Sequence, residues 1–163
     1  MSYKVGIGYD IHRLVQGRKL FLGGIEIPYI KGLFGHSDGD ALLHAICDAL
    51  LGAVAAGDIG EHFPDADPKY HNISSVDLLK TVKDLIVEKN FLIHHLDTIV
   101  VAQEPSLSPF KKQMQEKIAQ ILNIGGDCIN IKAKTHEGIG ELGQGEVIAC
   151  YAIVTLITKE EEC

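Results

Sequence analysis

The chain has 163 residues, 46% of them hydrophobic, and a formal net charge of −7. This length predicts one domain, residues 1–163, whose core is large enough to fold without disulfides or a structural metal. No apolar run approaches the roughly 20 residues that cross a bilayer, and no cluster of Lys and Arg suits nucleic acid, so we expect neither a membrane nor nucleic acid as a partner. The four cysteines form no C-x-x-C pair, and the first residues resemble no targeting segment. We therefore expect a cytoplasmic protein with reduced thiols, in which Cys47, Cys128 and Cys150 are small buried side chains.

The first part of the chain predicts a strand, a hairpin and a helix. Apolar residues that alternate with glycines predict a strand over residues 3–9, and Gly23-Gly24 between two short apolar runs predicts a two-residue hairpin turn. Further along, apolar residues recur at helical spacing. The pattern predicts a helix that begins at Ser37 or Asp38 and ends near Gly57, the expected C-terminal cap.

The rest of the chain alternates between helices and strands after one long loop. Residues 58–72 are rich in Pro and Asp and predict a loop, which at this length is usually functional or disordered. The elements that follow are a helix from Ser74 or Ser75, a strand over 92–102, a helix from Ser108-Pro109 to Gly125-Gly126, a strand from residue 129, a Gly-rich segment over 135–146 and a strand over 147–158. This order predicts the α+β class, as a two-layer α/β sandwich in which a mixed sheet carries helices on one face.

Asp10-x-His12 and the later His44 form a candidate metal site. Residues i and i+2 of an extended segment point the same way, so Asp10 and His12 can converge on one ion, and His44 can reach it from a helix packed alongside. Two imidazoles and a carboxylate with one open position are typical of a catalytic zinc site. The same residues are also compatible with histidines packed near the core and an aspartate that caps a turn.

The segment His36-Ser37-Asp38-Gly39-Asp40 lies where the predicted helix begins. A helix N-terminus offers free backbone amides and a positive dipole end, which favour an anion, and His36 and Ser37 can donate hydrogen bonds to phosphate oxygens. Asp38 or Asp40 can cap the same helix end. The two interpretations are compatible with each other.

Two further segments carry polar residues that suit a ligand. The carboxylates after Asp58 would repel a phosphate, so at a binding site they would accept hydrogen bonds from the hydroxyls of a polyol or hold a cation. Thr135 and Glu137 follow a predicted strand and precede glycines, where they can hold a nucleotide and a second divalent ion. This segment lacks the residue order of a P-loop, which is thereby excluded.

Together, these motifs resemble those of the 2-C-methyl-D-erythritol 2,4-cyclodiphosphate synthase family, over nearly the whole chain. The resemblance rests on G-Y-D-I-H, H-S-D-G-D, D-I-G-x-x-F-P-D, V-A-Q-E-P and K-A-K-T-H-E-G-I-G, in this order. It implies a metal-assisted cyclisation of 4-diphosphocytidyl-2-C-methyl-D-erythritol 2-phosphate with release of CMP, a step of the non-mevalonate isoprenoid pathway. It also implies a homotrimer whose active sites lie between neighbouring subunits.

The resemblance also implies roles for individual residues. Asp10, His12 and His44 would hold one zinc ion per subunit, and Glu137 would carry Mg²⁺ or Mn²⁺ together with the substrate diphosphate. His36 and Thr135 match positions credited with stabilising the transition state. The residues implied to contact substrate are Asp10, His12, His36, Ser37, Asp58, Ile59, Gly60, Phe63, Pro64, Asp65, Asp67, Ala102, Gln103, Pro105, Ser106, Leu107, Ala133, Lys134, Thr135, His136 and Glu137.

A few positions depart from the family pattern. Glu141 and Gln144 stand where an aromatic residue and an Arg are common, Ser106 replaces a commoner Lys, and Lys134 replaces a commoner Thr. Lys134 can restore a positive charge near the nucleotide.

Three other functions fit parts of the same pattern. Two histidines and a carboxylate also hold non-haem iron in oxygenases. A zinc-stabilised trimeric binding module would use the metal for folding and not for chemistry. A simple phosphohydrolase would use similar residues but release a linear product.

Overall fold

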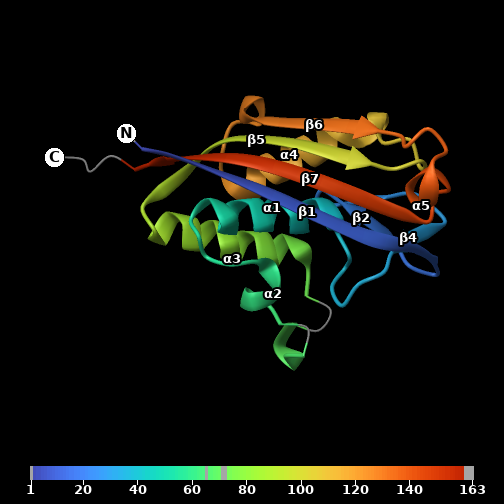
Figure 1. Ribbon diagram of the computed structural model, residues 1–163, viewed down its shortest axis with the longest axis horizontal. Coiled ribbons are helices and arrows are strands. Elements are labelled where there is room, and N and C mark those ends of the chain that lie inside the picture. Colours follow the sequence, from blue (N-terminus) through green and yellow to red (C-terminus); the bar gives the residue numbers. More distant parts are fainter. Residues whose placement is uncertain (1, 65, 71–72, 160–163) are drawn as a thin grey trace.

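The sheet of this protein has five strands in the order β4-β1-β7-β5-β6 (Figure 1). The computed structural model describes residues 2–64, 66–70 and 73–159. The strands are β1 (Tyr3–Gln16), β4 (Lys31–Leu33), β5 (Phe91–Val101), β6 (Ile129–Lys134) and β7 (Val147–Thr158), and a separate hairpin joins β2 (Leu20–Leu22) to β3 (Ile25–Ile27). Strands β5 and β6 run parallel, whereas the β1–β4, β1–β7 and β5–β7 pairs are antiparallel. The predicted mixed sheet and hairpin are therefore confirmed.

Three longer helices cover one face of this sheet: α1 (Ala41–Ala53), α3 (Ser75–Glu88) and α4 (Lys111–Leu122) (Figure 1). Alternation along β7 shows which face is covered, because Cys150, Ala152 and Val154 are buried while Tyr151 and Ile153 are exposed. The short helices are α2 (Ile59–His62), α5 (Gly140–Gly143), η1 (Pro68–Tyr70), η2 (Ser108–Phe110) and η3 (Gly126–Cys128). The predicted α+β class is confirmed. Among the described residues, no helix has the length and apolar character needed to cross a membrane.

Two glycines let α1 lie directly on β1. A Cβ atom on Gly8 would stand 1.9 Å from the carbonyl oxygen of Ala45, and one on Gly6 would stand 1.9 Å from that of Ala49. Both contacts are to helix backbone, so no side chain could move aside. This close packing fixes the height of α1 above β1, and it does so within two residues of Asp10 on the strand and one residue of His44 on the helix.

The opposite side of β1 and β7 is apolar and exposed, and we call it the outer face. Its residues are Tyr3, Val5, Ile7, Tyr9 and Ile11 on β1 and Tyr151 and Ile153 on β7, with exposures from 42% to 70%. Across the two strands Tyr9 lies opposite Tyr151, and their ring centroids are 4.9 Å apart. A contiguous apolar surface of this kind marks an interaction site more often than a surface left in water.

A polar cluster borders the outer face on β5 and β6. Lys132 Nζ lies 2.5 Å from Asp97 Oδ2, and the Asn130 side-chain amide donates to Asp97 Oδ1 at 2.9 Å. Partial burial acts to raise the pKa of Asp97, but the hydrogen bonds from Lys132 and Asn130 outweigh it and lower that pKa below its ordinary value.

The first helix begins later than the sequence predicted. Asp40 is its N-cap and accepts a hydrogen bond from the Leu43 amide at 3.1 Å, so Ser37 and Asp38 lie in the loop before the helix. Gly39 has a φ of +75°, which a right-handed helix cannot accommodate and which prevents an earlier start. The helix also ends at Ala53, before Gly57.

Four further predictions are corrected. Residues 58–72 are not loop throughout, since they include α2 and η1, and Asp58 caps α2 by accepting from the Glu61 amide at 3.0 Å. Strand β1 continues well beyond residue 9 because it pairs with β7 and then with β4. Helix α4 ends at Leu122, because its C-cap Asn123 has a φ of 57° that stops the helix before the two glycines. Cys128 is only partly buried, whereas Cys47 and Cys150 are buried as predicted.

Candidate metal centre and active site

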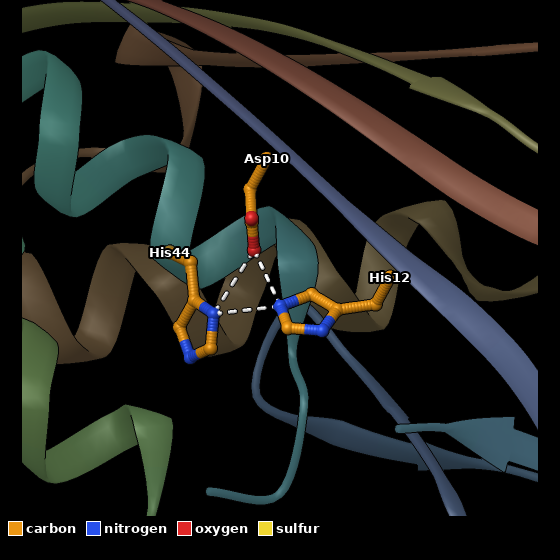
Figure 2. A group of neighbouring side chains, drawn as sticks. All are labelled: Asp10, His12 and His44. Atoms are coloured by element: carbon orange, nitrogen blue, oxygen red, sulfur yellow. Dashed lines mark hydrogen bonds and ion pairs between the residues drawn. The ribbon is translucent and has the colours of Figure 1, made fainter. Parts of the chain in front are cut away.

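Three half-buried side chains from β1 and α1 meet at one point (Figure 2). Asp10 Oδ2 lies 2.8 Å from His12 Nε2 and 3.0 Å from His44 Nδ1, and the two imidazole nitrogens are 3.2 Å apart. Asp10 and His12 share the helix-facing side of β1 because they are two residues apart, and His44 reaches them from the first turn of α1. The three side chains predicted as metal ligands are therefore brought together.

The hydrogen-bonding partner of His12 determines which of its nitrogens faces Asp10 with a lone pair. Its Nδ1 lies 2.6 Å from the carbonyl oxygen of Phe34, and a carbonyl only accepts, so Nδ1 carries the proton when the ring is neutral. Nε2 then presents its lone pair to the shared point. A carboxylate oxygen and an imidazole lone pair repel each other unless a proton or a cation lies between them, so this donor set suits a metal ion.

The electrostatics of Asp10 and His12 agree with that arrangement. Burial acts to raise the pKa of Asp10, but hydrogen bonds and positive charge from His12 and His44 outweigh it and lower that pKa strongly. Burial acts to lower the pKa of His12, whereas its hydrogen bond to Asp10 raises it, and the net shift is upward. The site is therefore built to hold positive charge beside an ionised carboxylate, and a bound dication would displace the proton that otherwise supplies that charge.

A pocket of about 220 Å³ opens beside these three side chains. Besides them, its lining residues are Gly35, His36, Ser37, Ile59, Gly60, Phe63, Tyr70, Ile73 and Leu78. Polar residues of the loop before α1 thus face the same cavity as the start of α2. The pocket combines a cation-binding corner, side chains that can donate hydrogen bonds to a phosphate, and a partly apolar wall. This combination is typical of a small-molecule site.

Several residues predicted to contact substrate lie next to this pocket without lining it. Asp58 is exposed and caps α2, Asp67 accepts a hydrogen bond from the Lys69 amide at 2.9 Å at the start of η1, and Pro64 follows Phe63. Asp65 lies outside the described residues. The sequence did not single out Tyr70, whose ring meets that of Phe63 edge-on with centroids 5.3 Å apart. Its aromatic ring within an otherwise polar segment was the feature of the sequence that could have indicated a binding residue.

The second group of predicted contact residues lies apart from this pocket. Residues 102–107 follow β5, and residues 133–137 comprise the last two residues of β6 and the three that follow it. The Ala102 amide joins the two segments by donating to the Lys134 carbonyl at 2.9 Å. Thr135 Oγ1 donates to Glu137 Oε1 at 3.0 Å. The group consists of Ala102, Gln103, Pro105, Ser106, Leu107, Ala133, Lys134, Thr135, His136 and Glu137, and none of these described residues lines the cavity beside Asp10.

Gln103 stands out within that second group. Its Oε1 is buried and accepts no hydrogen bond from any residue that the structure describes. An unsatisfied buried acceptor costs about 1–3 kcal/mol. A donor from a ligand or from another subunit would remove that cost.

Comparison with known proteins points to one family. Residues 3–157 match the family model described as YgbB. The 2-C-methyl-D-erythritol 2,4-cyclodiphosphate synthase of Alkaliphilus metalliredigens is 56% identical over 153 residues, which cover 94% of this chain and 96% of that protein.

Solved structures agree in fold over nearly the whole chain. The IspF of Plasmodium falciparum, solved as a CDP complex, matches with a TM-score of 0.86 and 36% identity, and the match covers 98% of each chain. The bifunctional IspDF from Campylobacter jejuni matches with a TM-score of 0.93 and 41% identity over 96% of this chain, but over 42% of its own length. This chain thus spans less than half of that bifunctional protein.

Proposed function

Because this chain belongs to the YgbB family, we propose that it converts 4-diphosphocytidyl-2-C-methyl-D-erythritol 2-phosphate to 2-C-methyl-D-erythritol 2,4-cyclodiphosphate and CMP. The observation that carries the proposal is the convergence of Asp10, His12 and His44 beside one pocket. His36 and Ser37 line the same pocket. The curated relatives bear the name of this synthase, and one structural relative was solved with CDP.

The reaction itself explains why the pocket needs this chemistry. An oxygen of the 2-phosphate attacks the phosphorus bonded to the erythritol oxygen, a new P–O–P bond closes the ring, and the P–O bond to CMP breaks. Nucleophile, electrophile and leaving group are all anionic, so catalysis depends on charge neutralisation and in-line placement more than on proton transfer. No nucleophilic Ser or Cys is required.

Asp10, His12 and His44 would hold zinc, one ion per subunit, because two imidazoles and one carboxylate are a usual set for catalytic zinc. When bound, the zinc would act as a Lewis acid that neutralises a phosphate oxygen. Glu137 would carry Mg²⁺ or Mn²⁺ together with the substrate diphosphate. This second ion is supported by the resemblance and by the exposed carboxylate of Glu137, three residues after β6.

His36 and Ser37 would donate hydrogen bonds to the substrate phosphates. The Ser37 hydroxyl oxygen accepts from the Gly39 amide at 3.1 Å, which leaves its own proton available for an acceptor in the pocket that Ser37 lines. The methylerythritol part would lie against Ile59, Gly60 and Phe63, with Asp58 accepting from its hydroxyls.

The cytidine would bind at the joined ends of β5 and β6. The unsatisfied acceptor of Gln103 supports a hydrogen-bond donor at this place, such as the amino group of a nucleobase. Thr135 and Lys134 would face the phosphate end of the nucleotide. Because these segments do not line the pocket beside Asp10 of the same chain, a complete site needs a second subunit.

A homotrimer with active sites between subunits meets that need. The outer face supports it, because Ile7 and Ile153 are 70% and 47% exposed and lie opposite each other on neighbouring strands. Assembly around this face would bury the apolar side of the sheet that the helices leave uncovered.

Residues 1–163 would act as one domain in the cytoplasm. The buried residues of β1, α1, α3, α4, β5 and β7 form one contiguous core, which supports a single folding unit. Cys47 and Cys150 are free, and burial raises the pKa of both thiols, which makes them unreactive packing residues compatible with a reducing compartment.

The decisive experiment supplies the purified protein with the proposed substrate, Zn²⁺ and Mg²⁺, and follows CMP release together with the phosphorus NMR spectrum of the product. A cyclic diphosphate supports the proposal, a linear product identifies a phosphohydrolase, and the absence of CMP refutes both. Elemental analysis distinguishes zinc from iron. Circular dichroism after chelation distinguishes a catalytic metal, which leaves a folded inactive protein, from a structural metal, whose loss unfolds it.

A further inference from the structure

A partly buried hydrogen-bonded pair lies behind His44, on the side away from Asp10. Ser75, the first residue of α3, is fully buried, and its amide donates to Asp38 Oδ2 at 3.0 Å. Its hydroxyl group contacts the other oxygen of the same carboxylate. The hydroxyl oxygen also lies 2.9 Å from His44 Nε2. Asp38, Ser75 and His44 therefore form one continuous chain of hydrogen bonds.

The number of protons available determines the direction of each bond. An ionised carboxylate carries no proton, so the Ser75 hydroxyl donates to Asp38. A hydroxyl has one proton, and this proton is used toward Asp38, so the same oxygen can only accept from His44. His44 must then carry its proton on Nε2, which leaves a lone pair on Nδ1, the nitrogen that lies 3.0 Å from Asp10 Oδ2.

We propose that Asp38 and Ser75 are positioning residues that hold His44 with Nε2 protonated and Nδ1 directed at the metal. The inference rests on the proposed metal-dependent function and adds two residues to it. Neither residue touches the metal or the substrate in this arrangement. They act through His44 by fixing its ring orientation and by strengthening Nδ1 as a ligand.

The pair is needed because Asp10 favours the opposite arrangement. A lone carboxylate 3.0 Å away draws a proton onto Nδ1 of His44, and a proton there would occupy the place of the cation. Ser37 Oγ offers a second acceptor to Nε2, but at 3.2 Å, and it also accepts from the Gly39 amide. Ser75 is nearer and fully buried, so it is the main acceptor.

The test compares Ser75→Ala with Ser74→Ala, a matched control in the same helix turn. Ser74 caps α3 by accepting from the Val76 amide at 3.2 Å, and it is no partner of His44 among the described contacts. Competition with a chromophoric chelator measures zinc affinity. We expect Ser75→Ala to lose about 10- to 100-fold in affinity. Ser74→Ala should lower the melting temperature and leave the affinity unchanged.

A second variant and a spectrum keep the inference testable if Ser75→Ala does not fold. Asp38→Asn offers an amide proton to the Ser75 oxygen, which frees the hydroxyl proton to turn toward Nε2, and it should weaken zinc binding in the same range. In the zinc-loaded unmodified protein, nitrogen NMR should show His44 protonated at Nε2, with a proton that exchanges slowly with water.

Two outcomes would overturn the inference. One is equal zinc affinity in Ser75→Ala and Ser74→Ala, and the other is a spectrum in which Nε2 of His44 is the metal-bound nitrogen. Both leave the proposed function standing, provided that the unmodified protein binds zinc. If the unmodified protein binds no zinc, the proposed metal chemistry fails and the inference fails with it.

Discussion

Replacing Gly8 by alanine should damage both the fold and the metal centre, since this position sets the distance between β1 and α1. The added Cβ would stand 1.9 Å from the Ala45 carbonyl oxygen and 2.7 Å from the Ala49 amide nitrogen. Ordinary contact begins at 3.4 Å, so the helix must move away by about 1.5 Å at this point. His44 precedes Ala45 directly and would move with it.

Two magnitudes follow from this displacement. Overpacking of a tight core contact typically costs about 1–3 kcal/mol, and each kcal/mol lowers the melting temperature by about 2–4 °C in a chain of this size. Metal–ligand distances tolerate only about 0.2 Å. A shift of His44 comparable to that of Ala45 is several times larger than this tolerance. The relative loss of zinc affinity should therefore exceed the relative loss of folding stability.

Gly6→Ala and Gly126→Ala are the matched controls. Gly6 makes an equally close contact, 1.9 Å to the Ala49 oxygen, but it lies one helical turn farther from His44, so its variant should lose similar stability and less zinc affinity. No atom of the described residues stands within 4 Å of a Cβ on Gly126, so its variant should match the unmodified protein. Thermal unfolding and chelator competition measure the two effects. If Gly8→Ala melts and binds zinc like Gly126→Ala, the close packing of β1 and α1 does not control the site.

The other predictions concern activity, pH and assembly. Asp10→Asn and His44→Ala should each lower the rate of CMP release at least about 100-fold while the circular dichroism spectrum stays native. The reason is that a bound metal stabilises the transition state by several kcal/mol. Unfolding of these variants would instead indicate a structural metal. The lowered pKa of Asp97 stabilises the folded protein above about pH 3.9, and this contribution is lost as the pH falls through the folded-state pKa. Urea unfolding should therefore show Asp97→Asn less stable than the unmodified protein at pH 7, by under about 1 kcal/mol because the ion pair is exposed. At pH 2 the two proteins should have the same free energy of unfolding. An equal difference at both pH values would contradict the ion pair. If the chain forms the proposed trimer through the outer face, Ile153→Lys should shift the sedimentation coefficient toward that of a monomer, whereas Val87→Lys, similarly exposed on α3, should not. A trimer that survives Ile153→Lys would place its interface elsewhere.

Local patterns in the sequence were enough to predict most of the elements and the donor set of the site. The i, i+2 spacing of Asp10 and His12 already places both side chains on one side of a strand. The glycine pair after β2 predicted the hairpin, and the strand predicted over residues 147–158 has the bounds of β7. Each of these depends on neighbours a few residues apart, and such neighbours constrain one another whatever the rest of the chain does.

Longer-range features could be decided only by the tertiary structure. The start of α1 depends on Asp40, whose carboxylate is also bound by the Gly23 and Gly24 amides of a distant turn. Ser75 contacts His44 across 31 residues of sequence, so a residue that the sequence marks only as a helix start lies against a candidate metal ligand. The substrate roles of residues 102–107 and 133–137 stay predictions, because they require a ligand and a second subunit.

The sequence by itself determined which groups can bind a metal and on which elements they lie. The tertiary structure decided how closely those elements approach, which groups each imidazole nitrogen contacts, and which face of the sheet the helices leave uncovered. The physical reason is that residue type and local spacing fix chemistry and secondary structure. Distances between elements depend instead on packing contacts such as those of Gly6 and Gly8 with the backbone of α1.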